Sequence, residues 1–471
     1  MMKGLPKHIH IIGICGVATS ALAIAFHKAG VKVTGSDKGF FPPISTELER
    51  HGIPFYAGWH PEKMAEGGLP DLVMVGGASG TQNPETAYAR ERGVPAYSYP
   101  ELVGRYLVKS RSIVCAGTWG KTSSAALLSH ILIEAGLDPS YMFGGVSLSH
   151  EAPAALTDGG WSVLEGDEYK SSPTDRSPKF SHYKPTHLLL TAVSWDHADM
   201  YPTEASYLQA FKGLAASLPE DGLIVANKDD GGAAGTLAGS DRRIVWYGRD
   251  ADYSYGGVKR SRSGLELAIE RDGRSFSVAS PLLGAFQGEN IAGCFAMAHE
   301  IGIAPETIVA AIASFKGIKR RLERRLDGDA AASGVTVFDD IAHSPEKASS
   351  VLKELRGIYP APAAIVVVFE PNAGGRERAA AAKYGGAFKD ADAVIVPRLT
   401  KLKTADGGEA PMEGGELAAV ISRTHRDAAH IDDDGALVEK LAARAKKGDV
   451  IAFLGSHGFR GMIEGTVEKL S

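Results

Sequence analysis

Short apolar segments that alternate with helix-like stretches constrain the fold of this chain more than any other feature. Residues 8–14 (HIHIIGI) form one such segment, and a glycine-containing turn, a helix-like stretch at 19–28 and a second apolar segment at 31–34 follow it. This order of strand, turn, helix and strand predicts a βαβ unit, whose two strands run parallel. The pattern starts again at residues 111–117 and once more after Arg321. We therefore expect an α/β fold built on parallel sheets.

The chain is too long for one hydrophobic core. It has 471 residues, whereas single cores stop growing at roughly 250–300 residues. We expect three consecutive α/β domains: a Rossmann-like N-terminal domain (1–108), a central domain of the P-loop ATPase type (109–321) and a Rossmann-like C-terminal domain (322–471). Further strands are expected at 71–76, 94–97, 161–165, 187–192, 335–338, 364–369, 393–397 and 449–454, hairpins within 240–280, and helices at 204–217, 290–301, 305–315, 379–382 and 437–445.

Charge, cysteine content and hydropathy exclude several classes of protein. The formal net charge of −5 gives no reason to expect nucleic acid as a partner, because a phosphate backbone requires a basic surface. Cys15, Cys115 and Cys294 form no disulfide framework and are expected to be small buried side chains in a reducing compartment. No apolar run approaches the roughly 20 residues that span a bilayer, so we expect a cytoplasmic chain with no membrane partner.

A glycine-rich segment between a predicted strand and a predicted helix indicates phosphate binding. It comprises Gly117, Thr118, Trp119, Gly120, Lys121, Thr122 and Ser123. Backbone N–H groups at a helix start lack partners and attract anions, and glycines let the main chain approach phosphate oxygens. Lys121 would supply a charge for the β- and γ-phosphates, and Thr122 a hydroxyl for Mg²⁺. Cys115 stands where strict P-loop spacing requires glycine, so a turn that only caps the helix is an alternative.

Acidic residues and a histidine follow two later strands. These are the segments Glu165-Gly-Asp-Glu168 and Trp195-Asp-His-Ala-Asp199. In open α/β sheets, ligands bind at the carboxyl ends of strands, and Mg²⁺ takes carboxylate oxygens with phosphate and water completing its shell. We expect Glu165 and His197 to bind Mg²⁺ beside the phosphate loop. A solvated loop acid and a structural histidine are the alternatives for each residue taken alone.

A second glycine turn follows the first predicted strand. It comprises Gly13, Ile14, Cys15 and Gly16, and Ser36 and Asp37 end the next strand. A dinucleotide-binding turn has a similar form, with the acid on a ribose hydroxyl, but only two of its usual glycines are present here. A tight turn without a ligand is therefore an alternative. An NAD-dependent oxidoreductase would explain this turn, but it leaves the phosphate loop without a role.

Together these motifs resemble the Mur ligase family along nearly the whole chain. Residues 117–122 (GTWGKT) are similar to the family's GTHGKT, residues 165–169 (EGDEY) to EADEYD, and residues 196–199 match DHAD. Residues 319–323 match the KRRLE hinge, and residues 339–345 (DDIAHSP) are similar to DDFAHHP. The resemblance implies a three-domain enzyme that binds a UDP-sugar, ATP and an incoming amino acid or peptide.

The family's functional residues can be carried over position by position. The resemblance implies catalytic roles for Lys121, Glu165 and His197, with Thr122, Glu165 and His197 on the metal. It places ATP at Gly117, Thr118, Trp119, Gly120, Lys121, Thr122, Ser123, Asn290, Arg321 and Asp340, the UDP-sugar at Gly13, Ile14, Cys15, Gly16, Ser36 and Asp37, and the acceptor near His343, Glu370 and His457. Phe211 stands where some members carry a carbamylated lysine. Trp119, Ser344 and Asn372 depart from the family pattern, so an inactive ligase-like binding protein is an alternative.

The resemblance also implies the reaction. Such ligases phosphorylate a substrate carboxylate with ATP in the presence of Mg²⁺, and an amine then displaces the phosphate to form an amide. The segments 41–45, 175–180 and 369–371 favour the branch that joins L-alanyl-γ-D-glutamyl-meso-diaminopimelate to UDP-N-acetylmuramate in peptidoglycan recycling. The branch that adds L-alanine in peptidoglycan synthesis is the alternative. We expect only small-molecule substrates and a monomer or weak homodimer.

Overall fold

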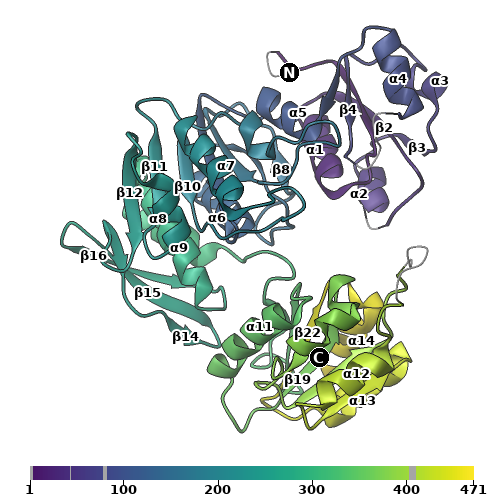
Figure 1. Ribbon diagram of the computed structural model, residues 1–471, viewed down its shortest axis with the longest axis vertical. Helices are drawn as coiled ribbons and strands as arrows, with labels where there is room; N and C mark the ends of the chain where they lie inside the picture. Colours follow the sequence, from purple (N-terminus) through teal and green to yellow (C-terminus); the bar gives the residue numbers. More distant parts are fainter. Residues whose placement is uncertain (1–3, 43, 78–81, 403–409) are drawn as a thin grey trace. The chain divides into compact units, whose positions relative to one another are not determined.

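The computed structural model describes residues 4–42, 44–77, 82–402 and 410–471. Within these residues the strands form three sheets, and helices accompany each of them (Figure 1). The expected α/β class is confirmed, and the chain has a three-domain architecture with parallel-rich sheets.

The first sheet is parallel throughout and has the order β3-β2-β1-β4-β5. Its first unit is the predicted βαβ unit, in which the fully buried strand β1 (His8–Ile12) leads through α1 (Val17–Lys28) to β2 (Lys32–Asp37). The other elements are α2 (Ile44–Arg50), β3 (Phe55–Ala57), α3 (Pro61–Met64), β4 (Leu72–Val75), α4 (Pro84–Glu91), β5 (Ala96–Ser98) and α5 (Tyr99–Tyr106).

The second sheet is centred on β6 (Arg111–Ala116), which pairs in parallel with β9 (Trp161–Gly166) and β10 (His187–Leu190). Ala116 lies opposite Gly166 and Leu190, so these three strands end at one edge. The strand path is β14-β15-β13-β12-β11-β10-β6-β9-β7-β8, with β16 paired to β15. The other elements are α6 (Lys121–Glu134), β7 (Ser140–Met142), β8 (Ala154–Ala155), η1 (Lys179–His182), α7 (Glu204–Ala216), β11 (Leu223–Asn227), α8 (Gly231–Leu237), β12 (Arg243–Gly248), β13 (Tyr253–Tyr255), β14 (Lys259–Ser261), β15 (Gly264–Arg271), β16 (Arg274–Ser280), α9 (Phe286–Glu300) and α10 (Pro305–Ser314).

The third sheet has the order β17-β18-β22-β19-β20-β21 and is parallel except for β17 at its edge. Its strands are β17 (Glu323–Leu326), β18 (Thr336–Asp340), β19 (Ile365–Glu370), β20 (Ala393–Pro397), β21 (Ala428–Ile431) and β22 (Val450–Gly455). Its helices are α11 (Pro345–Ile358), η2 (Gly374–Arg376), η3 (Arg378–Tyr384), α12 (Gly414–Ser422), α13 (Asp434–Arg444), η4 (Phe459–Gly461) and α14 (Met462–Leu470).

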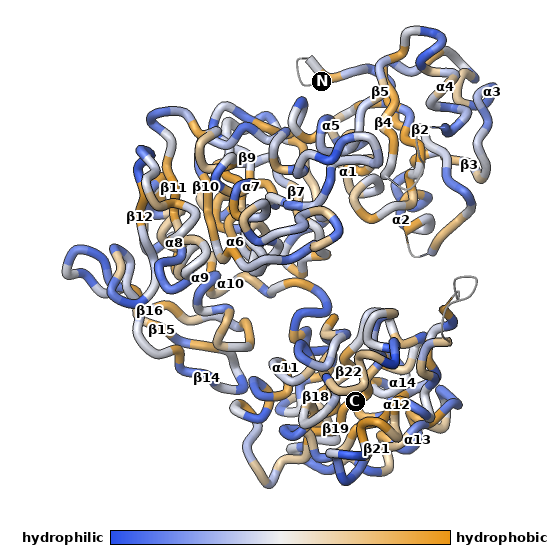
Figure 2. The backbone as a smooth tube through the Cα atoms, viewed as in Figure 1, coloured by the Kyte–Doolittle hydropathy of each residue, from blue (hydrophilic) through white to orange (hydrophobic). Residues whose placement is uncertain are grey.

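The middle strands of the third sheet are buried along their whole length and are mostly apolar. Every residue of β19 and of β22 is buried, as parallel strands are when helices cover both faces of a sheet. Figure 2 shows strands such as β4, β10 and β19 in orange and much of the surrounding chain in blue. A continuous apolar run therefore marks the core strands better than strict alternation does.

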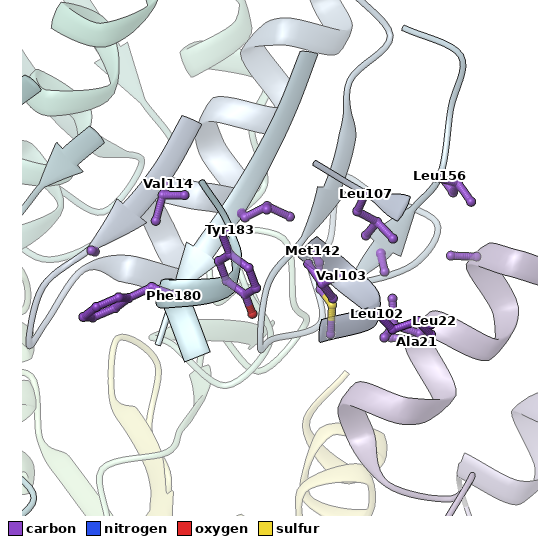
Figure 3. Packing of buried hydrophobic residues seen from close by; sticks show 14 of the residues in the cluster. Ala21, Leu22, Leu102, Val103, Leu107, Val114, Met142, Leu156, Phe180 and Tyr183 are labelled. Atoms are coloured by element: carbon purple, nitrogen blue, oxygen red, sulfur yellow. The ribbon is translucent and has the colours of Figure 1, made fainter. Parts of the chain in front are cut away.

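The chain divides into two compact units. The first consists of Met1–Gly257, Leu267–Ser280 and Gly288–Lys316, and the second of Val258–Glu266, Pro281–Gln287 and Gly317–Ser471. The first unit holds the first sheet and most of the second sheet, and these two sheets share a hydrophobic cluster, whereas β14 and the start of β15 belong to the second unit. In Figure 3, Ala21 and Leu22 of α1 lie beside Leu102 and Val103 of α5, with Met142 of the second sheet next to them.

Most predicted elements lie within a few residues of those observed, but three details differ. The interval 240–280, predicted to hold hairpins, begins with β12, which is parallel to β11. The predicted helix at 379–382 is the 3₁₀ helix η3. The strands β3, β7, β8, β11, β17 and β21 were not predicted. The domain bounds at 108 and 321 remain predictions.

Two simpler expectations can be checked against the described residues. The three cysteines are free and buried, as expected. Across residues 4–42, 44–77, 82–402 and 410–471, no helix combines the length and apolar character that a membrane crossing needs.

Candidate functional site

The phosphate loop lies between the buried strand β6 and α6, as predicted. Gly120 is the N-cap of α6 at φ +81°, and no side chain caps this helix end. The first backbone N–H groups of α6 can therefore donate hydrogen bonds to an anion. Neither loop glycine tolerates a side chain: a Cβ at Gly117 would lie 2.3 Å from Thr191 Oγ1, and one at Gly120 would lie 2.4 Å from Asn290 Oδ1. The structure therefore brings Asn290, a predicted ATP residue, against the phosphate loop.

Lys121 is held at the start of α6 by its own loop and by a buried acid. Its Nζ donates to Gly117 O at 2.7 Å, to Thr118 O at 3.3 Å and to Glu168 Oε1 at 3.0 Å. Glu168 is 1% exposed, and this burial raises the pKa of its carboxyl while Lys121 opposes the rise. The lysine thus forms a buried ion pair beside the amides expected to bind phosphate.

The predicted metal ligands are partly assembled. Thr122 Oγ1 donates to Glu165 Oε1 at 2.8 Å, and Gly144 N–H donates to Glu165 Oε2 at 2.5 Å. His197 adopts φ +55° and its Nε2 lies 3.6 Å from Glu168 Oε1. In the described part of the chain, no three His, Cys, Asp or Glu side chains form a metal site by themselves. This donor set fits Mg²⁺, which takes the rest of its shell from phosphate and water.

A cavity of 260 Å³ borders Glu165. Its lining includes Val17 and Ala18 at the start of α1, Met142 and Phe143 after β7, and the side chain of Glu165. The cavity therefore extends between the start of α1, which follows the glycine turn, and the predicted metal ligand of the second sheet.

Asp167 and Lys179 add two charges to the lining of this cavity. Lys179 Nζ lies 2.5 Å from Asp167 Oδ2. Lys179, together with the backbone hydrogen bond that Asp167 accepts from Tyr169, holds the pKa of Asp167 below its usual value against the effect of burial. The cavity thus contains a lysine and two carboxylates among apolar side chains.

The N-terminal turn is ordered by the end of β2. The N–H groups of Gly13 and Ile14 donate to Ser36 O at 2.8 and 3.1 Å, and Cys15 N–H donates to Asp37 Oδ2 at 2.8 Å. Gly16 is the N-cap of α1, which no side chain caps. The structure therefore brings the six predicted UDP-sugar residues together. The Ser36 hydroxyl faces away from the turn's amides and donates to Glu85, which is completely buried.

Two predicted ATP residues lie in the second unit. Asp340 is buried, and its two oxygens accept from Leu322 N–H and Ala342 N–H at 2.7 and 2.8 Å. Arg321 is exposed between Arg320 and Leu322, which adopt φ +58° and +47°. Asp340 thus stabilises the turn that presents Arg321.

The predicted acceptor residues lie at the carboxyl edge of the third sheet. Glu370 Oε1 accepts from Thr400 N–H at 2.9 Å and lies 3.6 Å from His457 Nδ1, and Arg460 binds its Oε2 at 3.2 Å. His343 O accepts from Asn372 N–H at 3.1 Å. Glu370 is 1% exposed, so it stabilises this edge through buried contacts.

Sequence reasoning missed two residues of these sites. Glu168 was in a quoted motif, but only the structure shows that this acid, three residues after Glu165, reaches Lys121. Arg320, and not Arg321, ties the 319–323 segment to the third sheet through Asp339 and the carbonyls of Gly455 and His457. Adjacent arginines cannot be told apart by a motif.

Phe211 belongs to the hydrophobic core of the first unit. It is completely buried and packs on Phe180 and Tyr207 at ring distances of 5.5 and 5.1 Å. The neighbouring Lys212 is exposed. The site therefore has no lysine at the place where some ligases carry a carbamylated one.

In this site, β6, the glycine loop and α6 hold Lys121 beside the pair Thr122 and Glu165. This arrangement defines an α/β enzyme that uses a nucleoside triphosphate. The chain belongs to the Mur ligase family: models of that family's catalytic domain, middle domain and glutamate ligase domain match residues 8–111, 115–298 and 320–457.

Individual relatives carry two different names. The UDP-N-acetylmuramate–L-alanyl-gamma-D-glutamyl-meso-2,6-diaminoheptandioate ligase of Escherichia coli is 30% identical over 98% of both chains. The UDP-N-acetylmuramate–L-alanine ligase of Kineococcus radiotolerans is 32% identical over 95% of this chain and 93% of that protein. The structure of the UDP-N-acetylmuramate–alanine ligase of Thermotoga maritima superposes with a TM-score of 0.77 at 21% identity, covering 99% of each chain.

Family membership fixes the general activity. The chain is an ATP-dependent amide-bond-forming ligase of peptidoglycan metabolism that uses ATP and Mg²⁺ in its central domain and acts on small molecules. The NAD-dependent oxidoreductase considered above is therefore excluded.

Proposed function

We propose that the chain joins the peptide L-alanyl-γ-D-glutamyl-meso-diaminopimelate to the carboxylate of UDP-N-acetylmuramate, in peptidoglycan recycling. The observation that carries this proposal is the cavity lined both by the start of α1 and by Glu165. A sugar nucleotide with its diphosphate on the uncapped turn at Gly13–Gly16 can extend its carboxylate through this cavity toward Glu165. The phosphate loop then binds the second substrate, ATP, at the same edge of the second sheet.

The reaction needs charge neutralisation and alignment more than a protein nucleophile. ATP supplies the phosphoryl group, and Mg²⁺ neutralises its negative charge. Lys121 and the amides at the start of α6 bind the terminal phosphates, and Thr122, Glu165 and His197 would hold the Mg²⁺. A carboxylate oxygen of the sugar attacks the γ-phosphorus and ADP leaves. The peptide amine then attacks the acyl carbon, phosphate leaves, and the proton that the amine loses passes to the departing phosphate.

Support for a peptide acceptor comes from the E. coli relative and from three segments of this chain. The segments are residues 41–45, 175–180 and 369–371, of which Pro43 lies outside the described residues. L-alanine is the second candidate, because the Kineococcus relative is as similar as the E. coli one.

The deciding experiment offers both acceptors in parallel. The protein is incubated with ATP, Mg²⁺ and UDP-N-acetylmuramate plus either the tripeptide or L-alanine, and the products are weighed by mass spectrometry. We expect the UDP-sugar tripeptide product and stoichiometric phosphate release. A product with L-alanine alone would reject the peptide assignment. Lys121→Ala serves as the control that should form neither product.

A further inference from the structure

Glu168 is a buried acid for which the proposed reaction has no direct use. It is 1% exposed and lies just beyond the end of β9. Its two oxygens lie 3.0 and 2.9 Å from Lys121 Nζ. A carboxylate this deeply buried is costly unless it is paired, so the ammonium of Lys121 stabilises its charge.

The same carboxylate reaches the predicted metal ligand. His197 Nε2 lies 3.6 Å from Glu168 Oε1. His197 stands in a left-handed conformation at φ +55°, which a non-glycine residue keeps only where surrounding contacts enforce it. Glu168 thus lies between the lysine of the phosphate loop and the histidine of the 196–199 segment.

Two tyrosines hold Glu168 in place. Tyr201 OH donates to the main-chain O of Glu168 at 2.6 Å, and Tyr207 OH lies 3.4 Å from Glu168 Oε1. Tyr207 OH is also 3.0 Å from Thr118 Oγ1 of the phosphate loop. Both tyrosines are buried. Tyr201 therefore holds the backbone of Glu168, and Tyr207 contacts its carboxylate.

We infer that Glu168 is a positioning residue, which fixes the ammonium of Lys121 and the imidazole of His197 so that both face the transferring phosphoryl group. This role rests on the proposed function, because it serves the same phosphoryl transfer. Without Glu168, the Lys121 ammonium keeps only the carbonyls of Gly117 and Thr118. Misplacement of a catalytic group by about 1 Å can lower a rate on the order of 100-fold.

The first test compares wild type, Glu168→Gln and the control Glu204→Gln, an exposed residue at the start of α7. The acceptor is whichever one wild type uses, so the test does not depend on the tripeptide assignment. We expect kcat of Glu168→Gln to fall about 10- to 100-fold, with the KM values for UDP-sugar and acceptor changed less than about twofold. A kcat equal to that of Glu204→Gln would overturn the role.

A double-mutant cycle separates positioning from a general structural effect. Because Glu168 also contacts His197, adding Glu168→Gln to Lys121→Ala should lower the residual phosphate release by a smaller factor than Glu168→Gln lowers that of wild type, since one of its two interactions is already lost. Multiplied losses would overturn the inference. If Glu168→Gln does not fold, Tyr207→Phe replaces it in the test, because this variant removes the hydrogen bond from Tyr207 to the same carboxylate. A lowered kcat with unchanged KM is expected, and an unchanged kcat would overturn it.

Discussion

Glu165 and Glu168 have different partners in the phosphate site. Glu165 accepts hydrogen bonds from the Thr122 hydroxyl and from Gly144 N–H, so it joins the phosphate loop to the wall of the cavity. Glu168, three residues further, contacts Lys121 instead. Two neighbouring acids therefore serve different partners, one the expected metal and one the lysine.

Replacement of Glu165 by glutamine should raise the Mg²⁺ requirement. A neutral amide is a weaker ligand for this hard cation than a carboxylate. We expect the Mg²⁺ concentration that gives half-maximal phosphate release to rise on the order of 10- to 100-fold. Titration of Mg²⁺ at saturating ATP measures this change, with Glu204→Gln as the control. An unchanged midpoint would remove Glu165 from the metal site.

Much of this site could be predicted from the sequence, because local motifs define it. Gly117–Ser123 follows a continuous apolar strand, and that order alone places its amides at a helix start. The pairing of Lys121 with Glu168 could not be predicted, since it depends on how a loop after β9 folds back over α6. Likewise, the antiparallel edge strand β17 carries the polar sequence ERRL, which has no strand-like alternation.

At the scale of elements, α6 has functionally different ends. Gly120 at its start has φ +81° and lies against Asn290, whereas Gly136 just past its end has φ +72° and open space where a Cβ would stand. Both positions strain an alanine, but only the first would displace a predicted ATP residue.

A pair of alanine substitutions separates these effects. Each should cost about 1 kcal/mol of stability through its left-handed backbone. We expect Gly120→Ala also to lose most ATP binding, because the loop or Asn290 must move, while Gly136→Ala binds ATP as wild type does. Isothermal titration with ATP and Mg²⁺, beside thermal unfolding, measures both properties. Equal ATP affinity in the two variants would contradict the assigned loop geometry.

The segment after β7 contains a half-buried histidine. His150 is hydrogen-bonded to Ser147 Oγ and Ser129 Oγ at 2.8 and 3.1 Å, and its ring meets the edges of Tyr141 and Phe143. Burial, aided by the nearby His130, lowers the pKa of His150 from 6.5 to about 4. The folded chain therefore binds fewer protons at this site than the unfolded chain does between these two pH values.

Acidification should consequently destabilise the first unit through His150. Its contribution is present above pH 6.5 and is lost as the pH falls toward 4. Between pH 7 and pH 5 we expect His150→Gln to lose about 2 kcal/mol less unfolding free energy than wild type. Urea unfolding at both pH values gives the comparison. Parallel losses in the two proteins would show that His150 does not titrate in this way.

At the scale of the whole molecule, the predicted ATP residues are divided between the two units. Lys121 and Asn290 belong to the first, and Arg321 and Asp340 to the second. The longest segment of the second unit begins at Gly317, three residues before the turn at Arg320–Leu322. If all four residues bind ATP, as the resemblance to the family implies, we expect substrates to bring the two units together.

Substrate binding should make the molecule more compact. We expect the radius of gyration in small-angle X-ray scattering to decrease when a non-hydrolysable ATP analogue, Mg²⁺ and UDP-N-acetylmuramate are added together. ATP analogue with Lys121→Ala provides the control that should change less. An unchanged radius of gyration in wild type would contradict closure.

The burial of the three cysteines has a practical consequence for following such motion. Burial raises the pKa of the thiols of Cys15, Cys115 and Cys294, and thiols that stay protonated react slowly with maleimides. One cysteine introduced on the surface of each unit would therefore take up dye selectively. Single-molecule fluorescence energy transfer between two such dyes could therefore follow the motion without prior replacement of the three native cysteines.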